Sequence, residues 1–335
     1  ILLLLAVVVG LSLLLFAARA PTMKAGGHFA LMSRETFLLV NNVLLLVACA
    51  AVLLGTLYPL IVDALGLGKL SVGPPYFNAV FVPIMLPLLL LIGVGPVANW
   101  KQAELKTLLR KLVPAAVVAL LAGAVLPLLA GGWQPMAALA LTLAVWITAA
   151  IVLQTAERLR KPGRPTPSWW GMQLAHFGIA AFVVGVTMVS AYQQERDVRM
   201  EPGDTVTVGG YTFQFNGVKS VRGPNYEASR GSFTLSRDSQ PLGELLPEKR
   251  AYDSSSMPMT EAAIDAGFTR DVYVSLAEPL DPKTGAWAVR VYFKPFVDWI
   301  WGGCFLMALG GCLAAGDRRY RLRTRSATIP AGVAA

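Results

Sequence analysis

Two histidines are the side chains in this sequence best suited to carry chemistry, and they lie in different surroundings. His176 lies inside the apolar stretch Ser168–Ser190, which is long enough to cross the roughly 30 Å hydrocarbon layer of a bilayer as a helix. His28 follows Lys24 in a short basic segment, where we expect a solvated loop histidine. Burying an imidazole within a membrane span is costly and rare, so His176 is the functional candidate.

His176 fits four roles, which the residues alone leave open. It can be a structural histidine hydrogen-bonded to a neighbouring helix. It can belong to a proton relay, but a relay needs further buried acids, and the acids nearest the predicted spans all lie at their ends: Glu35, Glu104, Glu157, Asp298 and Asp317. It can bind zinc, which needs three or four ligands. It can also be an axial ligand of haem, for which one imidazole on a helix suffices. A haem held by two histidines needs its second ligand from outside this sequence, because no other histidine lies in a span.

The helical neighbours of His176 suggest how the ring is surrounded. At helical spacing His176 shares a face with Met172, Gln173, Ala180, Val183 and Thr187. Ala180 leaves space beside the ring, and Met172 and Val183 are expected to form an apolar wall of that space. A different face carries a small residue at every seventh position, which allows another helix to approach closely. These residues are Gly171, Gly178 and Gly185.

The elements that must position His176 are membrane helices. The chain of 335 residues is 55% hydrophobic, and lipid-exposed spans must satisfy their backbone internally as helices or closed barrels. We predict a polytopic α-helical membrane protein with about seven transmembrane helices and one periplasmic β-rich domain between the last two helices. The predicted spans are residues 1–18, 37–60, 77–98, 113–130, 136–156, 169–190 and 295–315. Before the third span, Pro74-Pro75 predicts a non-helical turn.

The basic residues predict the orientation of these spans. Alternate short loops and the tail carry sixteen Lys and Arg residues on one face, whereas the short loops of the opposite face hold only Lys69. The positive-inside rule makes the basic face and the C-terminus cytoplasmic. The formal charge of +9 therefore reflects membrane topology, and it does not indicate a nucleic-acid partner.

The segment between the last two spans has a different pattern. Apolar and polar residues alternate in runs such as Tyr211–Phe215 and Trp287–Phe293, and Gly209-Gly210 and Asp281-Pro282 mark turns. This pattern predicts a β-rich barrel or sandwich on the outer face. The piece Met259–Ala266 is expected to form a short helix within it.

These elements divide the chain into four parts. They are a transmembrane helical bundle over 1–191, a periplasmic β-rich domain over 192–294, a last transmembrane helix over 295–316 and a cytoplasmic basic tail over 317–335. Because the first span begins at residue 1 with no loop before it, we expect the chain to be the C-terminal piece of a longer protein.

The ordered fragments along this chain resemble the C-terminal half of the CcmF/NrfE family, the membrane haem lyases of bacterial cytochrome c maturation (System I). The resemblance covers residues from about 1 to 325. It is carried by Leu13–Arg19, Ser33–Glu35, Gly73–Asn78, Gly93–Pro96, Trp170–Gly178, Glu195–Met200, Glu248–Arg250, Met259–Ile264, Trp287–Arg290, Trp299–Trp301 and Asp317–Arg321.

The resemblance implies a role for His176. The family's Leu-Ala-His-x-Gly histidine, here His176, is one axial ligand of a transmembrane haem b, so His176 is also the ligand to the haem iron. The second ligand comes from an N-terminal part or a separate N-terminal subunit, and so does the tryptophan-rich segment that handles substrate haem. Trp169-Trp170 is not that segment, because no Asp follows and it lies on the cytoplasmic side. No catalytic residue is assigned within this chain.

The resemblance also implies the reaction and its partners. A family member of this kind attaches haem covalently to the Cys-x-x-Cys-His motif of apocytochrome c in the periplasm, from the bacterial inner membrane. The implied partners are haem, a holo haem chaperone of CcmE type, CcmH/CcmI-type apocytochrome delivery proteins, apocytochrome c and quinol as electron source. The alternatives are a haem transporter or carrier, and a non-catalytic assembly scaffold.

Overall fold

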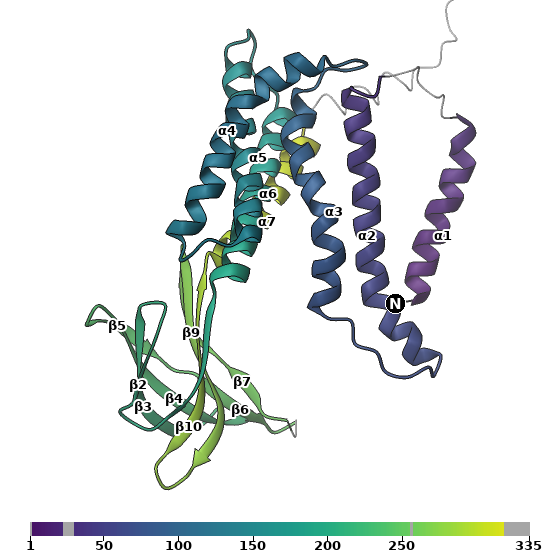
Figure 1. Ribbon diagram of the computed structural model, residues 1–335. Helices are drawn as coiled ribbons and strands as arrows, with labels where there is room; N and C mark the ends of the chain where they lie inside the picture. Colours follow the sequence, from purple (N-terminus) through teal and green to yellow (C-terminus); the bar gives the residue numbers. More distant parts are fainter. Residues whose placement is uncertain (1, 23–29, 255–256, 318–335) are drawn as a thin grey trace, which may run out of the picture.

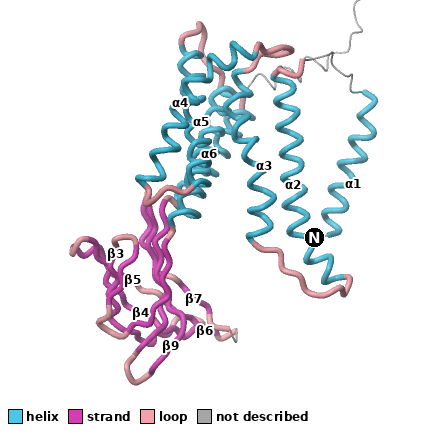
Figure 2. Tube along the Cα trace, in the orientation of Figure 1, coloured by secondary structure: helices cyan, strands magenta, loops and turns pink. Residues whose placement is uncertain are grey.

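The computed structural model describes residues 2–22, 30–254 and 257–317. His28 and most of the basic tail lie outside the described residues, so their predicted placement stays a prediction. Figures 1 and 2 show long helices on one side and a separate body of strands on the other.

The helices account for most of the chain. Six of those described, α2 to α7, are long and apolar enough to cross a membrane, and α1 is a further apolar helix of 18 residues. Their bounds are α1 (Leu2–Arg19), α2 (Arg34–Ala64), α3 (Pro74–Val94), α4 (Leu105–Leu129), α5 (Pro135–Leu159), α6 (Pro167–Tyr192) and α7 (Val297–Ala315), with short 3-10 helices η1 (Ala20–Thr22) and η2 (Gly95–Val97). A polytopic helical membrane protein with a β domain between its last two helices is confirmed.

The start of α3 corrects one expectation. Pro74 and Pro75 are the first residues of this helix rather than a non-helical turn before it. The first backbone N–H groups of a helix have no intrahelical partner, so a proline there loses no hydrogen bond, and its fixed φ suits the helix. The proline pair therefore marks where the helix begins.

Helices α3 to α6 share an apolar core of Leu, Ala, Ile and Trp side chains, including Ala115, Ala144 and Ile147. Trp146 of α5 donates a hydrogen bond from Nε1 to the carbonyl oxygen of Leu90 in α3, at 3.0 Å. Gly93 makes room for this ring, since a Cβ there would lie 2.4 Å from Trp146 Nε1. The indole therefore joins α5 to α3 by both packing and a hydrogen bond.

Helices α6 and α7 touch backbone to backbone. A Cβ added at Gly178 would lie 2.7 Å from the Gly303 carbonyl oxygen, and one added at Gly303 would lie 2.6 Å from the Gly178 oxygen. The same relation holds one heptad away between Gly171 and Gly310, at 2.5 Å. The heptad-spaced glycines of α6 thus allow α7 to approach it closely.

The β domain is a sandwich of two antiparallel sheets. One has the order β1-β10-β9-β8, and the other has the order β2-β3-β4-β6-β7, with β5 also paired to β4. The strands are β1 (Gln194–Met200), β2 (Thr205–Val208), β3 (Tyr211–Arg222), β4 (Tyr226–Arg237), β5 (Gln240–Leu245), β6 (Glu248–Tyr252), β7 (Met259–Glu261), β8 (Ala263–Gly267), β9 (Arg270–Asp281) and β10 (Ala286–Pro295).

Both sheets contribute to the domain's core. Phe213, Phe215 and Phe233 from one sheet and Val274 and Val291 from the other are fully buried. The period-two burial of β2 and the first half of β3 places alternate side chains in this core. The domain therefore has an apolar interior separate from that of the helices.

The expected helix over Met259–Ala266 is wrong. Its residues form edge strands β7 and β8, which pair with β6 and β9 in different sheets. Ala262, between them, is where the chain passes from one sheet to the other. Cross-strand hydrogen bonds and packing override the modest helix propensity of this stretch.

The junction between the two bodies is short. Helix α6 ends at Tyr192 and β1 begins at Gln194, while β10 ends at Pro295 and α7 begins at Val297. β1 and β10 pair with each other from the junction onward, with Gln194 opposite Phe293. The indole Nε1 of Trp299 in α7 also donates a hydrogen bond to the carbonyl oxygen of Phe268, in the turn between β8 and β9, at 3.1 Å.

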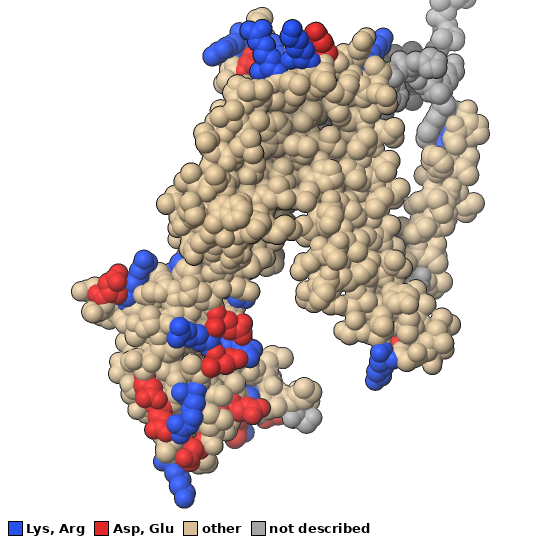
Figure 3. All heavy atoms as spheres, in the orientation of Figure 1, with Lys and Arg blue, Asp and Glu red and all other residues tan. Residues whose placement is uncertain are grey.

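Charges are distributed as a membrane-spanning chain requires. Figure 3 shows Lys and Arg gathered at the end of the helices away from the β domain, a wide band without charge, and mixed charges over the β domain. The uncharged band carries many exposed apolar side chains, such as Leu120 and Leu121 of α4, which suit contact with lipid. We refer to the charged end of the helices as the basic end.

Candidate functional site

Helix α6 carries the candidate residue, and its start is well defined. The hydroxyl of Thr166 caps the helix by accepting from the Trp169 N–H at 3.2 Å, and Pro167 takes the first helical position. Asp317, just beyond the end of α7, accepts the Ser168 N–H with its Oδ2 at 3.1 Å. These contacts and the glycine contact fix α6 against α7 from the basic end inward.

His176 lies nine residues after Pro167 on α6, which is about 14 Å along the helix axis from the basic end. Its side chain is half-buried, and its ring makes no hydrogen bond with any residue that the structure describes. The described residues therefore do not supply the hydrogen bond that the structural alternative requires. Among the described residues there is also no cluster of His, Cys, Asp and Glu able to hold a metal ion by itself.

Gln173 lies one turn before His176, and its hydrogen bond to α5 is not predicted by the sequence. Gln173, 3% exposed, donates from Nε2 to Gln154 Oε1 of α5 at 3.3 Å. Its own Oε1 is buried and has no partner among the described residues. Because an unpaired buried acceptor is costly, this oxygen marks a place where a donor from another group would be stabilising. The signal in the sequence is that Gln154 and Gln173 each lie inside a predicted span, where a polar side chain needs a partner.

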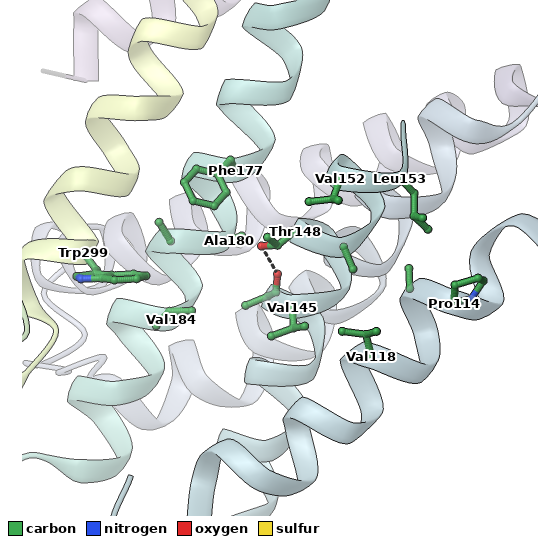
Figure 4. Close-up of a pocket in the computed structure, with 14 residues that line it drawn as sticks. Pro114, Val118, Val145, Thr148, Val152, Leu153, Phe177, Ala180, Val184 and Trp299 are labelled. Carbon is green, nitrogen blue, oxygen red and sulfur yellow. Dashed lines mark hydrogen bonds between the residues drawn. The ribbon is translucent and has the colours of Figure 1, made fainter. Parts of the chain in front are cut away.

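The space beside Ala180 opens on a side of α6 different from the one that carries Met172 and Val183. A cavity of about 440 Å³ lies between α4, α5 and α6, and Trp299 also lines it. Figure 4 shows Phe177, Ala180 and Val184 of α6 facing it. Neither Met172 nor Val183 lines this cavity, so the expected apolar wall is not found there. The Thr148 hydroxyl donates to Ala144 of its own helix, which leaves the lining apolar.

The β domain has a more polar cleft of about 590 Å³, lined in part by Asn216, Arg230, Glu244 and Trp287. Arg230 is held by Glu248, whose Oε1 accepts from Arg230 Nε at 2.5 Å. Glu248 is 5% exposed and also accepts from Arg250 at 2.7 Å.

The charge state of Glu248 follows from these neighbours. Burial alone would raise its pKa, but the hydrogen bonds and charges of Arg250 and Arg230 outweigh burial and lower the pKa overall. The ionised Glu248 therefore holds the cationic Arg230 at the edge of the cleft.

Together these features define a class: a multi-pass membrane protein with a half-buried histidine in one span and a β-sandwich inserted before its last helix. A family model described as the CcmF C-terminal beta-sandwich matches residues 191–295. The chain is also 50% identical over 95% of its length to the cytochrome c-type biogenesis protein CcmF of Pseudomonas aeruginosa and 45% identical over 94% to that of Escherichia coli, covering 49% of each. The chain belongs to the CcmF family.

Structural comparison agrees with this placement. A solved structure titled cytochrome c heme lyase CcmF superposes with a TM-score of 0.70 at 26% identity, covering 85% of this chain and 46% of that one. The cytochrome c-type biogenesis protein NrfE of Haemophilus influenzae is 32% identical over 88% of the chain. The chain thus spans about half the length of the curated relatives it matches.

Proposed function

We propose that this chain is the C-terminal part of a membrane haem lyase, which attaches haem covalently to the Cys-x-x-Cys-His motif of apocytochrome c. Its substrates are haem and the apocytochrome. Adding a cysteine S–H across a haem vinyl group forms a C–S bond and moves the thiol proton to the adjacent carbon, so the addition is redox-neutral. The proposal draws on the chain's family membership and on the histidine within α6.

The single observation that carries the proposal is the state of His176. It is a half-buried imidazole inside a membrane helix, and no described residue hydrogen-bonds to it. Burying such a group in a span is costly unless it serves a ligand or a path. We infer that His176 is one axial ligand of a haem b, whose second ligand comes from the N-terminal part of the protein or from an N-terminal subunit.

The residues present fit one axial position of such a haem. His176 offers a ring nitrogen with no competing hydrogen bond from the described residues, as an iron ligand requires. Haem b, when bound, would supply reversible one-electron transfer, which would keep the substrate haem ferrous with quinol as the electron source. The role of this chain's residues is to hold the iron ligand in an apolar, water-poor helix bundle.

The orientation that we propose follows the charge distribution. The basic end faces the cytoplasm of a bacterial inner membrane, and the β domain faces the periplasm. There the polar cleft beside Arg230 offers a surface to a CcmE-type haem chaperone and to CcmH/CcmI-type proteins that deliver apocytochrome. We propose the β domain as the platform on which these partners meet.

The test compares two histidine variants of the full-length protein. His176→Ala is expected to abolish the bis-imidazole haem signature in the visible spectrum of the purified protein. His28→Ala, outside the spans predicted from the sequence, is expected to leave it unchanged. An unchanged spectrum in His176→Ala contradicts the ligand assignment. In a reconstituted mixture, a haem carrier would change chaperone loading without changing thioether yield, and a scaffold would purify without haem.

A further inference from the structure

A second cavity lies at the basic end of the helices, apart from His176. Its volume is about 280 Å³. The ends of α2 to α6 and their connecting loops supply its walls, which include Arg34, Trp100, Lys111, Glu157, Arg158 and Lys161. Four basic residues and one acid in such a small space make it strongly cationic.

Three of these cations remain able to bind a ligand. Lys111 and Lys161 both contact the same oxygen of Glu157, at 3.2 and 3.3 Å, so one carboxylate is shared between two ammonium groups. Arg34 lies over the ring of Trp100 at 4.8 Å, and its guanidinium makes no hydrogen bond among the residues that the structure describes. Arg158, by contrast, is engaged with loop carbonyl oxygens. The Arg34 guanidinium and two ammonium groups that share one carboxylate can together bind a phosphate.

Two further cavities border the cationic cavity on the side of the apolar interior. A neighbouring cavity of about 250 Å³ shares Lys111, Gln154 and Glu157 with it and adds Leu112 and Ala150. That cavity shares Leu153 with the apolar cavity between α4, α5 and α6. From Leu153 back to Ala144, the apolar cavity follows α5 for about 14 Å. The cationic cavity, the smaller cavity and the apolar cavity therefore lie next to one another along α5.

We propose that these neighbouring cavities together bind one anionic phospholipid. Its phosphate lies among Arg34, Lys111 and Lys161, and one acyl chain follows the apolar cavity along α4 and α5. The charge of the head site selects an anionic over a zwitterionic head group, and basic sites between membrane helices at the cytoplasmic side suit such lipids.

The surroundings favour a lipid over a free phosphate ion. Trp100 is 58% exposed beside the head site, and tryptophan favours the head-group level of a bilayer. The apolar cavity below has no polar group left unpaired, since the Thr148 hydroxyl is bonded to its own helix. An inorganic phosphate uses only the upper part of this arrangement, whereas a phospholipid uses all of it.

The experiment measures lipid binding to the full-length protein by native mass spectrometry in detergent. Phosphatidylglycerol is titrated against wild type, against the double variant Arg34→Gln/Lys111→Gln, and against Lys106→Gln/Arg110→Gln as control. The control removes two exposed charges of the same end that do not line the cavity. Each lost contact is expected to weaken binding about fivefold, so the cavity variant weakens it about 25-fold and the control less than twofold.

Further arms separate the possible ligands. Phosphatidylcholine with the same acyl chains is expected to bind at least tenfold more weakly than phosphatidylglycerol, and millimolar inorganic phosphate is expected not to displace the lipid. Val152→Trp, which fills the apolar cavity at a 60%-exposed position without changing charge, is expected to weaken phosphatidylglycerol binding as well.

Three results would overturn the proposal. They are equal affinity for the two lipids, an equal loss of binding in the cavity and control double variants, and displacement of the lipid by inorganic phosphate. If the cavity double variant does not fold, Val152→Trp and the two-lipid comparison decide the question. None of these results bears on His176, which lies outside the cavities.

Discussion

The contact between α6 and α7 gives a prediction with a built-in control. In Gly303→Ala the added methyl would lie 2.6 Å from both the carbonyl oxygen and the backbone nitrogen that face it on α6. Those atoms belong to Gly178 and Phe182, and backbone atoms cannot rotate away as a flexible side chain would. In Gly302→Ala, one residue earlier on α7, the methyl would meet nothing within 4 Å.

The expected magnitudes differ in sign. Overpacking a close contact typically costs about 1–3 kcal/mol. Replacing glycine by alanine within a helix gains up to about 1 kcal/mol from helix propensity, and this gain applies to both variants. Gly302→Ala is therefore expected to be neutral or slightly stabilising. The difference in unfolding free energy between the two variants, about 1–3 kcal/mol, isolates the helix contact.

The assay is unfolding of the purified protein in mixed micelles with increasing SDS, followed by circular dichroism. Gly310→Ala and Gly311→Ala provide a second pair of the same kind. A Cβ added at Gly310 would lie 2.5 Å from the Gly171 carbonyl oxygen, whereas one added at Gly311 would meet nothing within 4 Å. If the two members of each pair unfold at the same SDS fraction, the close approach of α6 and α7 is not what stabilises this pair of helices.

Two further predictions concern single interactions in the two bodies. Trp146→Phe removes the hydrogen bond to Leu90 and should lower the unfolding free energy in micelles by about 1–2 kcal/mol, while Trp133→Phe, 54% exposed in the α4–α5 connection, should change it little; equal effects would contradict the role of that bond. Because the folded pKa of Glu248 is lowered, its contribution to stability is present above the unfolded carboxyl pKa of about 4.3 and is lost as the pH falls through the folded value. The protection factors of the β4 and β6 amides, which correct for the slower intrinsic exchange at low pH, should therefore fall on acidification in wild type and depend less on pH in Glu248→Gln. The same pH dependence of the protection factors in both proteins would refute the assignment.

Much of the helical architecture can be predicted from local sequence alone. A span of apolar residues flanked by basic loops is a one-dimensional signal, because each membrane helix satisfies its own backbone. The β domain was also recognisable as β-rich from period-two alternation. Its strand order was not, and Met259–Ala266 was misassigned because pairing with β6 and β9 depends on residues distant in sequence.

The candidate site was predictable only in part. His176 stands out because a histidine in an apolar span is rare, and its position on α6 follows from helical spacing. The side of α6 on which a cavity opens depends on how α4 and α5 pack, which the spacing does not determine. Some of the basic residues that predict the membrane topology also line one cavity, because the ends of five helices converge there.

The way in which the β-sandwich joins the helices has a mechanical consequence. Two connections join it to the helices, α6 to β1 and β10 to α7, and in each a single residue separates helix from strand. The hydrogen bond from Trp299 to Phe268 is a third link near the same place. Two adjacent connections and this hydrogen bond restrict rotation of the sandwich about the membrane normal. Any protein that docks on the sandwich therefore meets a surface held at a fixed distance from the membrane and in a fixed orientation.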